Sequence, residues 1–223
     1  MKFTTLSFGC VLFAALSLVP ASGVTVINGT FDDNAAAYTV WPGYNGQNGV
    51  NPANPTGWTI TGGGGINPVS PVGAGQDPFN DGASTGAFAF LQGETRLEQT
   101  IAGFAVGASY TLSLDFNARN CCTAGAGPIA DVYLNDVLLA SSTDLFPAPG
   151  YVIPGTLANG GNWYNADLPF VAGANSITLS IRARPSAGGA DTTLIVDNVS
   201  VVPEPSTFAA LVLSLGLLAR RRR

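Results

Sequence analysis

Apolar and polar side chains alternate with a period of two through the second half of the chain. The segment from Ser109 to Arg119 is the clearest case, because its apolar and polar residues fall at alternate positions. The apolar positions are Tyr110, Leu112, Leu114, Phe116 and Ala118. This period is typical of a β-strand that has one face in a core and the other in water.

The same pattern predicts strands along the rest of the chain. They are expected at residues 24–27, 58–60, 87–92, 96–101, 129–134, 137–140, 163–171, 175–184 and 192–201. Asn135-Asp136 suits the positive dihedral angles of a tight hairpin turn. With no amphipathic helical pattern between these strands, the sequence predicts an all-β antiparallel fold, either a sandwich or a barrel.

A long segment before the main run of strands has a different composition. Residues 32–82 are rich in Gly, Asn and Pro, and they include the four glycines Gly62 to Gly65. Such a composition predicts a loop, with one short strand at 58–60. Loops of this length in a compact domain are usually functional or mobile.

The N-terminus has the three parts of a secretory signal peptide. Lys2 supplies the positive charge, residues 11–19 are mostly apolar, and Ala21 follows as a small residue suited to a cleavage site. We expect a signal helix within residues 1–23, with cleavage after Ala21 or Gly23. Residues 24–202 then form the domain.

The C-terminus combines a proline-containing motif, an apolar run and a basic cluster. Pro203, Glu204 and Pro205 lie at the centre of the motif V-P-E-P-S, and four arginines end the chain. The apolar run, residues 208–219, would span only about 18 Å as a helix, less than the ~30 Å of a bilayer core. The arginines would hold their end on the cytoplasmic side.

This tail, residues 203–223, resembles the PEP-CTERM sorting signal in the order and spacing of its parts. The resemblance implies an exosortase as processing partner and a transient stay in the inner membrane. Delivery to the cell surface or the extracellular space would follow, in bacteria that make exopolysaccharide.

Charge and composition restrict what the domain can do. Residues 24–204 contain four arginines, no lysine and 14 acidic residues, so their net charge is 4 − 14 = −10. This charge disfavours nucleic acid as a partner. The chain has no histidine, which excludes the common serine and cysteine catalytic sites. The enzyme class that survives is a glycosidase with a carboxylate pair, for which Glu94 and Glu98 are the available glutamates. We expect no enzyme.

Five short segments occur in the order found in galactose-binding-like domains. They are residues 28–32, 57–58, 97–101, 107–112 and 196–201. The resemblance implies a two-sheet jelly roll, often with a structural calcium ion, and often with sugar bound on a concave face or at loop tips. Trp58 is at a position that packs inside in this family.

Asp197 is the first candidate for a metal ligand. It shares its parity with Ile195, Val199 and Val201, so the pattern places a carboxylate on an apolar face, where it needs a partner. Calcium is one partner, with Asp32 as the second ligand and Asp33 as a weaker candidate. Two alternatives are hydrogen bonds to backbone amides of residues 28–31 and a bulge that turns Asp197 outward.

Aromatic and polar side chains suggest a carbohydrate site. Sugars stack their C–H faces on flat rings and bind amides, carboxylates and arginines through their hydroxyls. The candidate residues are Asp115, Asn117 and Arg119 on the polar side of one strand, with Trp41, Tyr44, Trp163 and Tyr164 in or beside loops. The alternative for Trp163 and Tyr164 is ordinary packing beneath a loop.

Cys121 and Cys122 are the two cysteines left after signal cleavage. In an oxidising compartment they form either a strained vicinal disulfide or two free thiols. Zinc is disfavoured by the lack of histidine.

Three functions follow from the sequence, in this order. The first is an exported surface protein that binds polysaccharide without catalysis. The second is a structural matrix or coat protein with no dedicated ligand, and the third is a glycoside hydrolase.

Overall fold

The fold is known from a computed structural model that describes residues 23–67, 86–119, 127–142, 163–185 and 192–204. The predicted signal helix, the apolar tail helix and the Cys121-Cys122 pair lie outside these residues. The described strands are β1 (Thr59–Asn67), β2 (Phe88–Ala102), β3 (Ser109–Ala118), β4 (Ile129–Leu134), β5 (Val137–Ser141), β6 (Tyr164–Val171), β7 (Ser176–Arg184) and β8 (Thr193–Pro203). Two 3-10 turns, η1 (Ala35–Ala37) and η2 (Gln47–Gly49), precede them. None of the described ranges contains a helix that is long and apolar enough to span a membrane.

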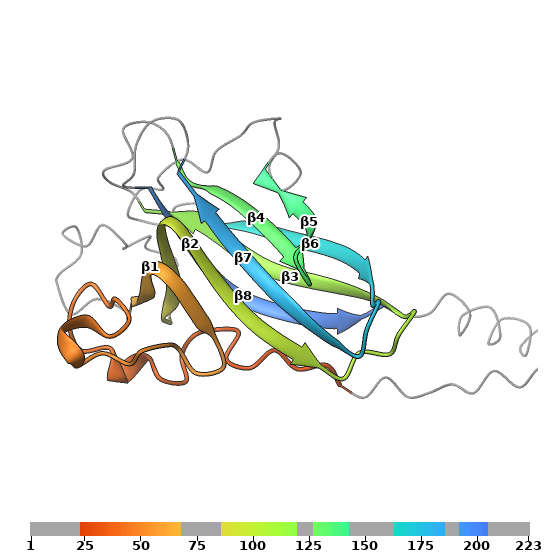
Figure 1. Cartoon of the computed structure of the whole chain (residues 1–223), viewed down its shortest axis with the longest axis horizontal. Coiled ribbons are helices and arrows are strands. Elements are labelled where there is room, and N and C mark those ends of the chain that lie inside the picture. Colours follow the sequence, from red (N-terminus) through yellow and green to blue (C-terminus); the bar gives the residue numbers. More distant parts are fainter. Residues whose placement is uncertain (1–22, 68–85, 120–126, 143–162, 186–191, 205–223) are drawn as a thin grey trace, which may run out of the picture.

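The strands form one antiparallel sheet that folds over on itself. Its order is β5-β4-β7-β2-β8-β3-β6, with β1 paired to β2. The early part of β2, residues 89–92, pairs with β8, whereas its later part, residues 95–102, pairs with β7. Strand β2 therefore runs through both layers, and β5 approaches β6 at the far edges. The result is a nearly closed, jelly-roll-like sandwich, as the sequence predicted (Figure 1).

The main core fills the space between the layers and comes from alternate residues of each strand. The apolar positions of β3 are buried in it, and those of β7 and β4 face them. Trp58 is part of this core, and its indole nitrogen donates a hydrogen bond to the carbonyl oxygen of Asn28 at 3.0 Å. The alternation read from the sequence is thus confirmed, including the positive φ angles of 49° at Asn135 and 60° at Asp136 in the β4–β5 turn.

The predicted strand at residues 24–27 was wrong. This segment has no ladder partner among the described residues, although Val24 is buried in the core. Gln99 of β2 takes the place of a neighbouring strand, because its side-chain amide binds the backbone of Ile27.

The predicted loop at Gly62 to Gly65 was also wrong, because these glycines belong to β1. Residues 43–44 cross this strand so closely that a Cβ atom on Gly65 would lie 1.9 Å from the carbonyl oxygen of Gly43. A bridge between Tyr44 and Gly65 joins the two segments. Composition indicated a loop, whereas the glycines serve close packing of backbone on backbone.

Candidate functional site

Side chains on the outside of the β2-β8-β3-β6 layer lie in cross-strand rows. In one row Phe90 pairs with Ile195, and Ile195 with Asn117. In the next row Asp197 pairs with Asp115, and Asp115 with Asn165. Neighbouring side chains point to opposite faces of a strand, so these rows share the side away from the main core. We call this side the outer face.

The outer face carries a second apolar cluster, separate from the main core. Phe88, Phe90 and Ile195 are buried in it, and the half-buried rings of Tyr44 and Trp163 pack against them. Tyr44 meets Phe90 edge-on at 5.1 Å between ring centroids, and Trp163 meets Phe88 at 6.3 Å. Two rings that are partly open to solvent therefore lie over the outer face.

A carboxylate held by two amides lies beside this aromatic cluster. The side-chain nitrogen of Asn165 donates a hydrogen bond to Asp115 at 2.9 Å, and that of Asn198 donates one to the other carboxylate oxygen at 2.8 Å. Asp115 is half-buried, and both asparagines are exposed. These three side chains, from β6, β3 and β8, form what we call the Asp115 triad.

Sequence reasoning missed both asparagines of the triad. Alternation along β6 places the side chain of Asn165 on the outer face. This could have been predicted from the sequence if β6 had been paired with β3. Asn198 has a φ of 52° at a register shift between β3 and β8. A β-bulge of this kind has no clear signature in a single sequence.

Asn117 and Arg119 share the outer face with Asp115 but are buried rather than lining an open surface. The hydroxyl of Thr193 is also buried there, and it finds no hydrogen-bond partner in the described part of the chain. Thr193 lies between Gln92, its register partner, and Arg119, whose amide donates to the Thr193 carbonyl oxygen at 3.2 Å. Polar groups buried on the outside of a sheet are unusual, because this side of an antiparallel sheet commonly faces water.

The other predicted aromatic residues lie elsewhere. Tyr164 packs against the main core, on the opposite side of β6 from the Asp115 triad. Trp41 is 49% exposed, and its ring enters none of the aromatic pairs that the described residues form. Of the aromatic candidates, Trp163 and Tyr44 lie in the second apolar cluster on the outer face.

Asp197 is 8% exposed, as its parity suggested, but it does not face the main core. The bulge at Asn198 shifts the alternation, so that Asp197 lies on the outer face while Val199 and Val201 return to the core. The backbone amide of Asn198 donates to the Asp197 carboxylate at 2.7 Å. A bulge next to Asp197 is thus present, but the carboxylate lies buried on the outer face rather than in solvent. Strand β8 is linked to the N-terminal segment by a hydrogen bond, which the backbone amide of Val199 donates to the carbonyl oxygen of Gly29 at 2.9 Å.

Asp32 and Asp197 would supply only part of the ligands of a calcium site. A carboxylate oxygen of Asp32 accepts a hydrogen bond from the backbone amide of Ala87 at 2.9 Å. Calcium needs six to eight oxygen ligands. No group of three or more potential acidic, histidine or cysteine ligands occurs within the described ranges. The calcium ion thus stays a prediction.

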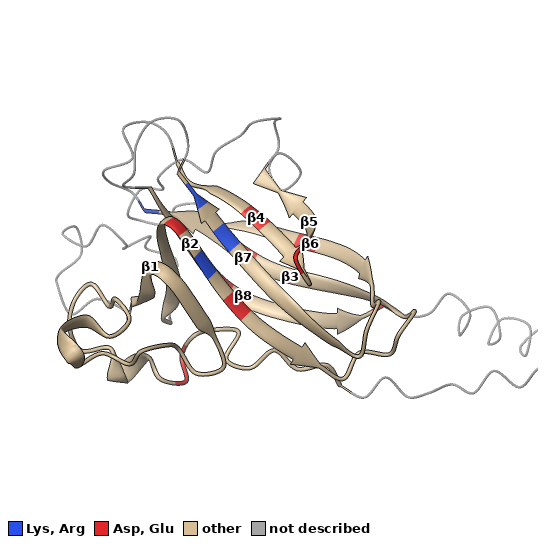
Figure 2. Ribbon diagram, viewed as in Figure 1, with Lys and Arg blue, Asp and Glu red and all other residues tan. Residues whose placement is uncertain are grey.

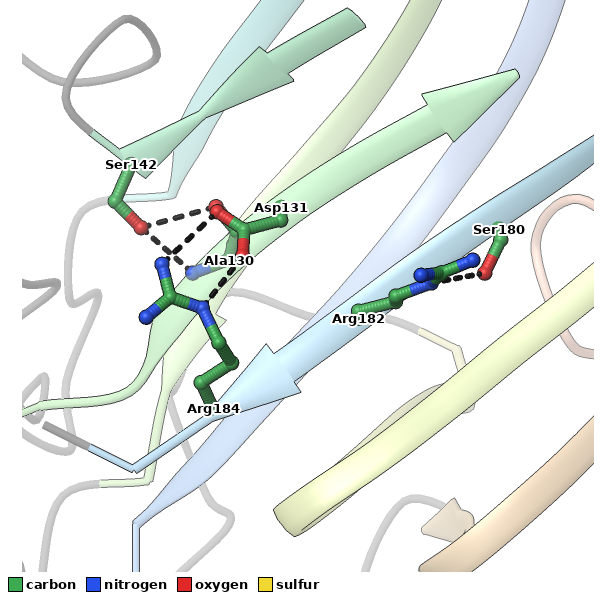
Figure 3. Close-up of polar contacts among 6 residues, drawn as sticks. All are labelled: Ala130, Asp131, Ser142, Ser180, Arg182 and Arg184. Carbon is green, nitrogen blue, oxygen red and sulfur yellow. Dashed lines mark hydrogen bonds and ion pairs between the residues drawn. The ribbon is translucent and has the colours of Figure 1, made fainter. Parts of the chain in front are cut away.

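The other layer consists of β5, β4, β7 and the later part of β2. Three of the four described basic residues lie on it, one on β2 and two on β7 (Figure 2). Arg184 forms an ion pair with the buried Asp131, with nitrogen–oxygen distances of 2.5 and 3.3 Å (Figure 3). This hydrogen bond raises the pKa of Arg184, against the opposing effect of burial. Arg182 stacks on Tyr133 at 3.9 Å and donates to Ser180 at 3.0 Å. These arginines have protein partners, so we assign them a structural role.

Glu94 and Glu98, the glutamates available for a glycosidase, belong to β2. Glu98 is half-buried and faces Arg96 at 4.0 Å, whereas Glu94 is exposed at the bend of β2.

Residues 201–223 match the model of the PEP-CTERM protein-sorting motif. The chain carries a PEP-CTERM sorting signal. Such a signal implies processing by an exosortase and export to the cell surface. The match includes the end of β8, since this strand runs through Pro203.

Solved structures of low sequence identity resemble the domain. A cyclase from Fischerella sp. TAU is 17% identical, with 82% of this chain and 97% of that chain covered and a TM-score of 0.50. A CBM4 structure is 17% identical, covering 81% and 100%, with a TM-score of 0.40. The CBM22-1 xylan-binding domain from Paenibacillus barcinonensis is 14% identical, covering 67% and 87%, with a TM-score of 0.37. The likeness to the cyclase concerns the fold alone. No curated protein sequence matches this chain.

Proposed function

We propose that this PEP-CTERM protein is a surface protein that binds carbohydrate, without catalysis, on the outer face of the β2-β8-β3-β6 layer. The observation that carries the proposal is the position of Trp163 beside the Asp115 triad. Trp163 directly precedes β6 and is two residues before Asn165, so the ring and the amide lie about 7 Å apart on the same face.

The chemistry of this region suits a sugar. The half-exposed indole of Trp163 offers a face to sugar C–H groups, while Phe88 beneath it holds the ring in place. Each amide of the triad keeps one further N–H donor and an acceptor oxygen for sugar hydroxyls. Strands β6, β3 and β8 lie about 4.8 Å apart, so the triad spans roughly 10 Å, the width of one or two sugar rings.

The buried polar residues add to this argument. Thr193 has a hydroxyl with no hydrogen-bond partner in the described ranges, next to the aromatic cluster. A buried group of this kind calls for a water or a polar ligand.

Isothermal titration calorimetry of residues 24–204 with neutral oligosaccharides tests the proposal. We expect Trp163→Ala and Asp115→Ala to weaken binding about tenfold each, the equivalent of ~1.4 kcal/mol. Tyr133→Ala and Asp136→Ala are matched controls on β4 and at its turn, on the other layer, and should leave the affinity unchanged.

A structural matrix protein without a ligand is the second candidate. The observation in its favour is that both oxygens of Asp115 already accept hydrogen bonds from protein amides. Absence of heat from every oligosaccharide, at concentrations up to the millimolar range, would favour this role over binding.

A further inference from the structure

The sorting motif begins inside the folded domain. Strand β8 continues through Val202 to Pro203, and Pro203 lies opposite Tyr110 of β3. Beyond the strand, the backbone amide of Glu204 donates a hydrogen bond to the carbonyl oxygen of Ser109 at 3.0 Å. The first three residues of V-P-E-P-S are therefore paired with β3.

A side chain of β3 also holds the motif. The hydroxyl of Thr111 donates a hydrogen bond to the carboxylate of Glu204 at 2.9 Å, and Thr111 is the register partner of Val202. Hydrogen bonds to an ionised acceptor are among the stronger ones. Val202, Pro203 and Glu204 are exposed, so little buried apolar surface keeps this end of β8 in place.

Pairing with β3 competes with recognition by an enzyme. Extended peptides commonly bind their receptors by adding a strand through their backbone N–H and C=O groups. Backbone groups already used toward β3 are not available for a second strand. An enzyme that reads the complete motif has to separate it from the domain first.

We infer that the folded domain controls access to its own sorting signal, through the contact of Thr111 and Ser109 with Glu204. The sorting enzyme acts on the complete motif after the end of β8 has detached from β3. Processing is then limited by how often this strand end opens. This role goes beyond carbohydrate binding and does not depend on it.

A reversible crosslink tests whether detachment is required. In a full chain with Cys121→Ser and Cys122→Ser, Thr111→Cys and Val202→Cys place two thiols at directly paired positions, where a disulfide can form. In cells that carry the exosortase, we expect the oxidised variant to remain unprocessed by intact mass, and a reductant to restore processing.

The control is the same crosslink elsewhere in the sheet. Thr100→Cys and Thr178→Cys join another exposed register pair, between β2 and β7. This variant should be processed at the original rate in both redox states. Normal processing of the oxidised Thr111→Cys, Val202→Cys variant would overturn the inference.

A second variant weakens the contact. Thr111→Val keeps the shape and the strand propensity but removes the hydrogen bond to Glu204. We expect processing to become about fivefold faster in a pulse–chase experiment, while Thr178→Val on β7 has no effect. Equal rates for the two valine variants would overturn the role of Thr111.

Discussion

The side chain of Gln99 binds both backbone polar groups of Ile27. Its oxygen accepts a hydrogen bond from the Ile27 amide at 2.8 Å, and its nitrogen donates to the Ile27 carbonyl oxygen at 2.9 Å. The same nitrogen donates to the carbonyl oxygen of Gly57 at 3.0 Å. One buried amide thus attaches two segments without regular structure to β2.

Replacing this amide should loosen both segments. We expect Gln99→Leu to lower the free energy of unfolding by about 2 kcal/mol, because partly buried backbone groups lose their partners. Urea unfolding measures the change. Thr100→Ala, at the exposed neighbouring position, should cost about 0.5 kcal/mol or less. Equal effects of the two substitutions would show that the amide contributes nothing specific.

Two glycines of β1 should respond differently to a methyl group. A Cβ atom at Gly65 would lie 1.9 Å from the carbonyl oxygen of Gly43, whereas at Gly63 the nearest atom, the carbonyl oxygen of Gln92, is 3.5 Å away. We expect Gly65→Ala to cost more than about 3 kcal/mol, since backbone has to move, and Gly63→Ala to cost less than about 1 kcal/mol. Thermal melts of the two variants compare them directly. Similar melting temperatures would contradict the close crossing of residues 43–44 over β1.

Burial of Tyr38 should make stability depend on alkaline pH. Burial raises the pKa of Tyr38 from 10.0 to about 12, and its hydroxyl donates to Asn45 at 2.9 Å. Between these values the unfolded chain loses the tyrosine proton first. The folded state therefore becomes less stable as the pH rises from 10 to 12, by up to about 3 kcal/mol.

Tyr38→Phe removes this dependence. At pH 8 the variant should be about 1 kcal/mol less stable, because the hydrogen bond to Asn45 is lost. Above pH 10 the difference should shrink and then reverse, as followed by urea unfolding at pH 8, 10 and 11.5. A constant difference over this range would contradict a protonated, buried Tyr38.

Periodicity predicted the strands well because one side of each strand lies in the main core. The limits of β4 match the predicted ones, and those of β3, β5, β6 and β7 differ by one residue at one end. Strand β8 begins one residue later and ends two residues later than predicted, and the two strands predicted at residues 87–92 and 96–101 form one strand, β2. Residues 24–27 have the composition of a strand, but their partner is the side chain of Gln99. The glycines of β1 were assigned to a loop because the contact that needs them, with Gly43, joins segments distant in sequence.

The candidate site was predictable in its polar strand and not in its detail. Alternation placed Asp115, Asn117 and Arg119 on one face, but it cannot tell a solvated face from a second buried cluster. Tyr164 was included because it lies beside a loop, yet alternation along β6 turns its side chain toward the main core. The bulge at Asn198 interrupts the alternation, so Asp197 and Val199 face opposite sides of β8 although they are two residues apart.

Nuclear magnetic resonance of residues 24–204 tests the carbohydrate site most directly. The side-chain N–H signals of Trp163, Asn165 and Asn198 report on the outer face, and the backbone amides of Tyr133 and Ser180 report on the other layer. Addition of a binding oligosaccharide should shift the first group in a saturable way and leave the second unchanged. Shifts confined to the other layer, or no saturable shift in the first group, would contradict the proposed carbohydrate site.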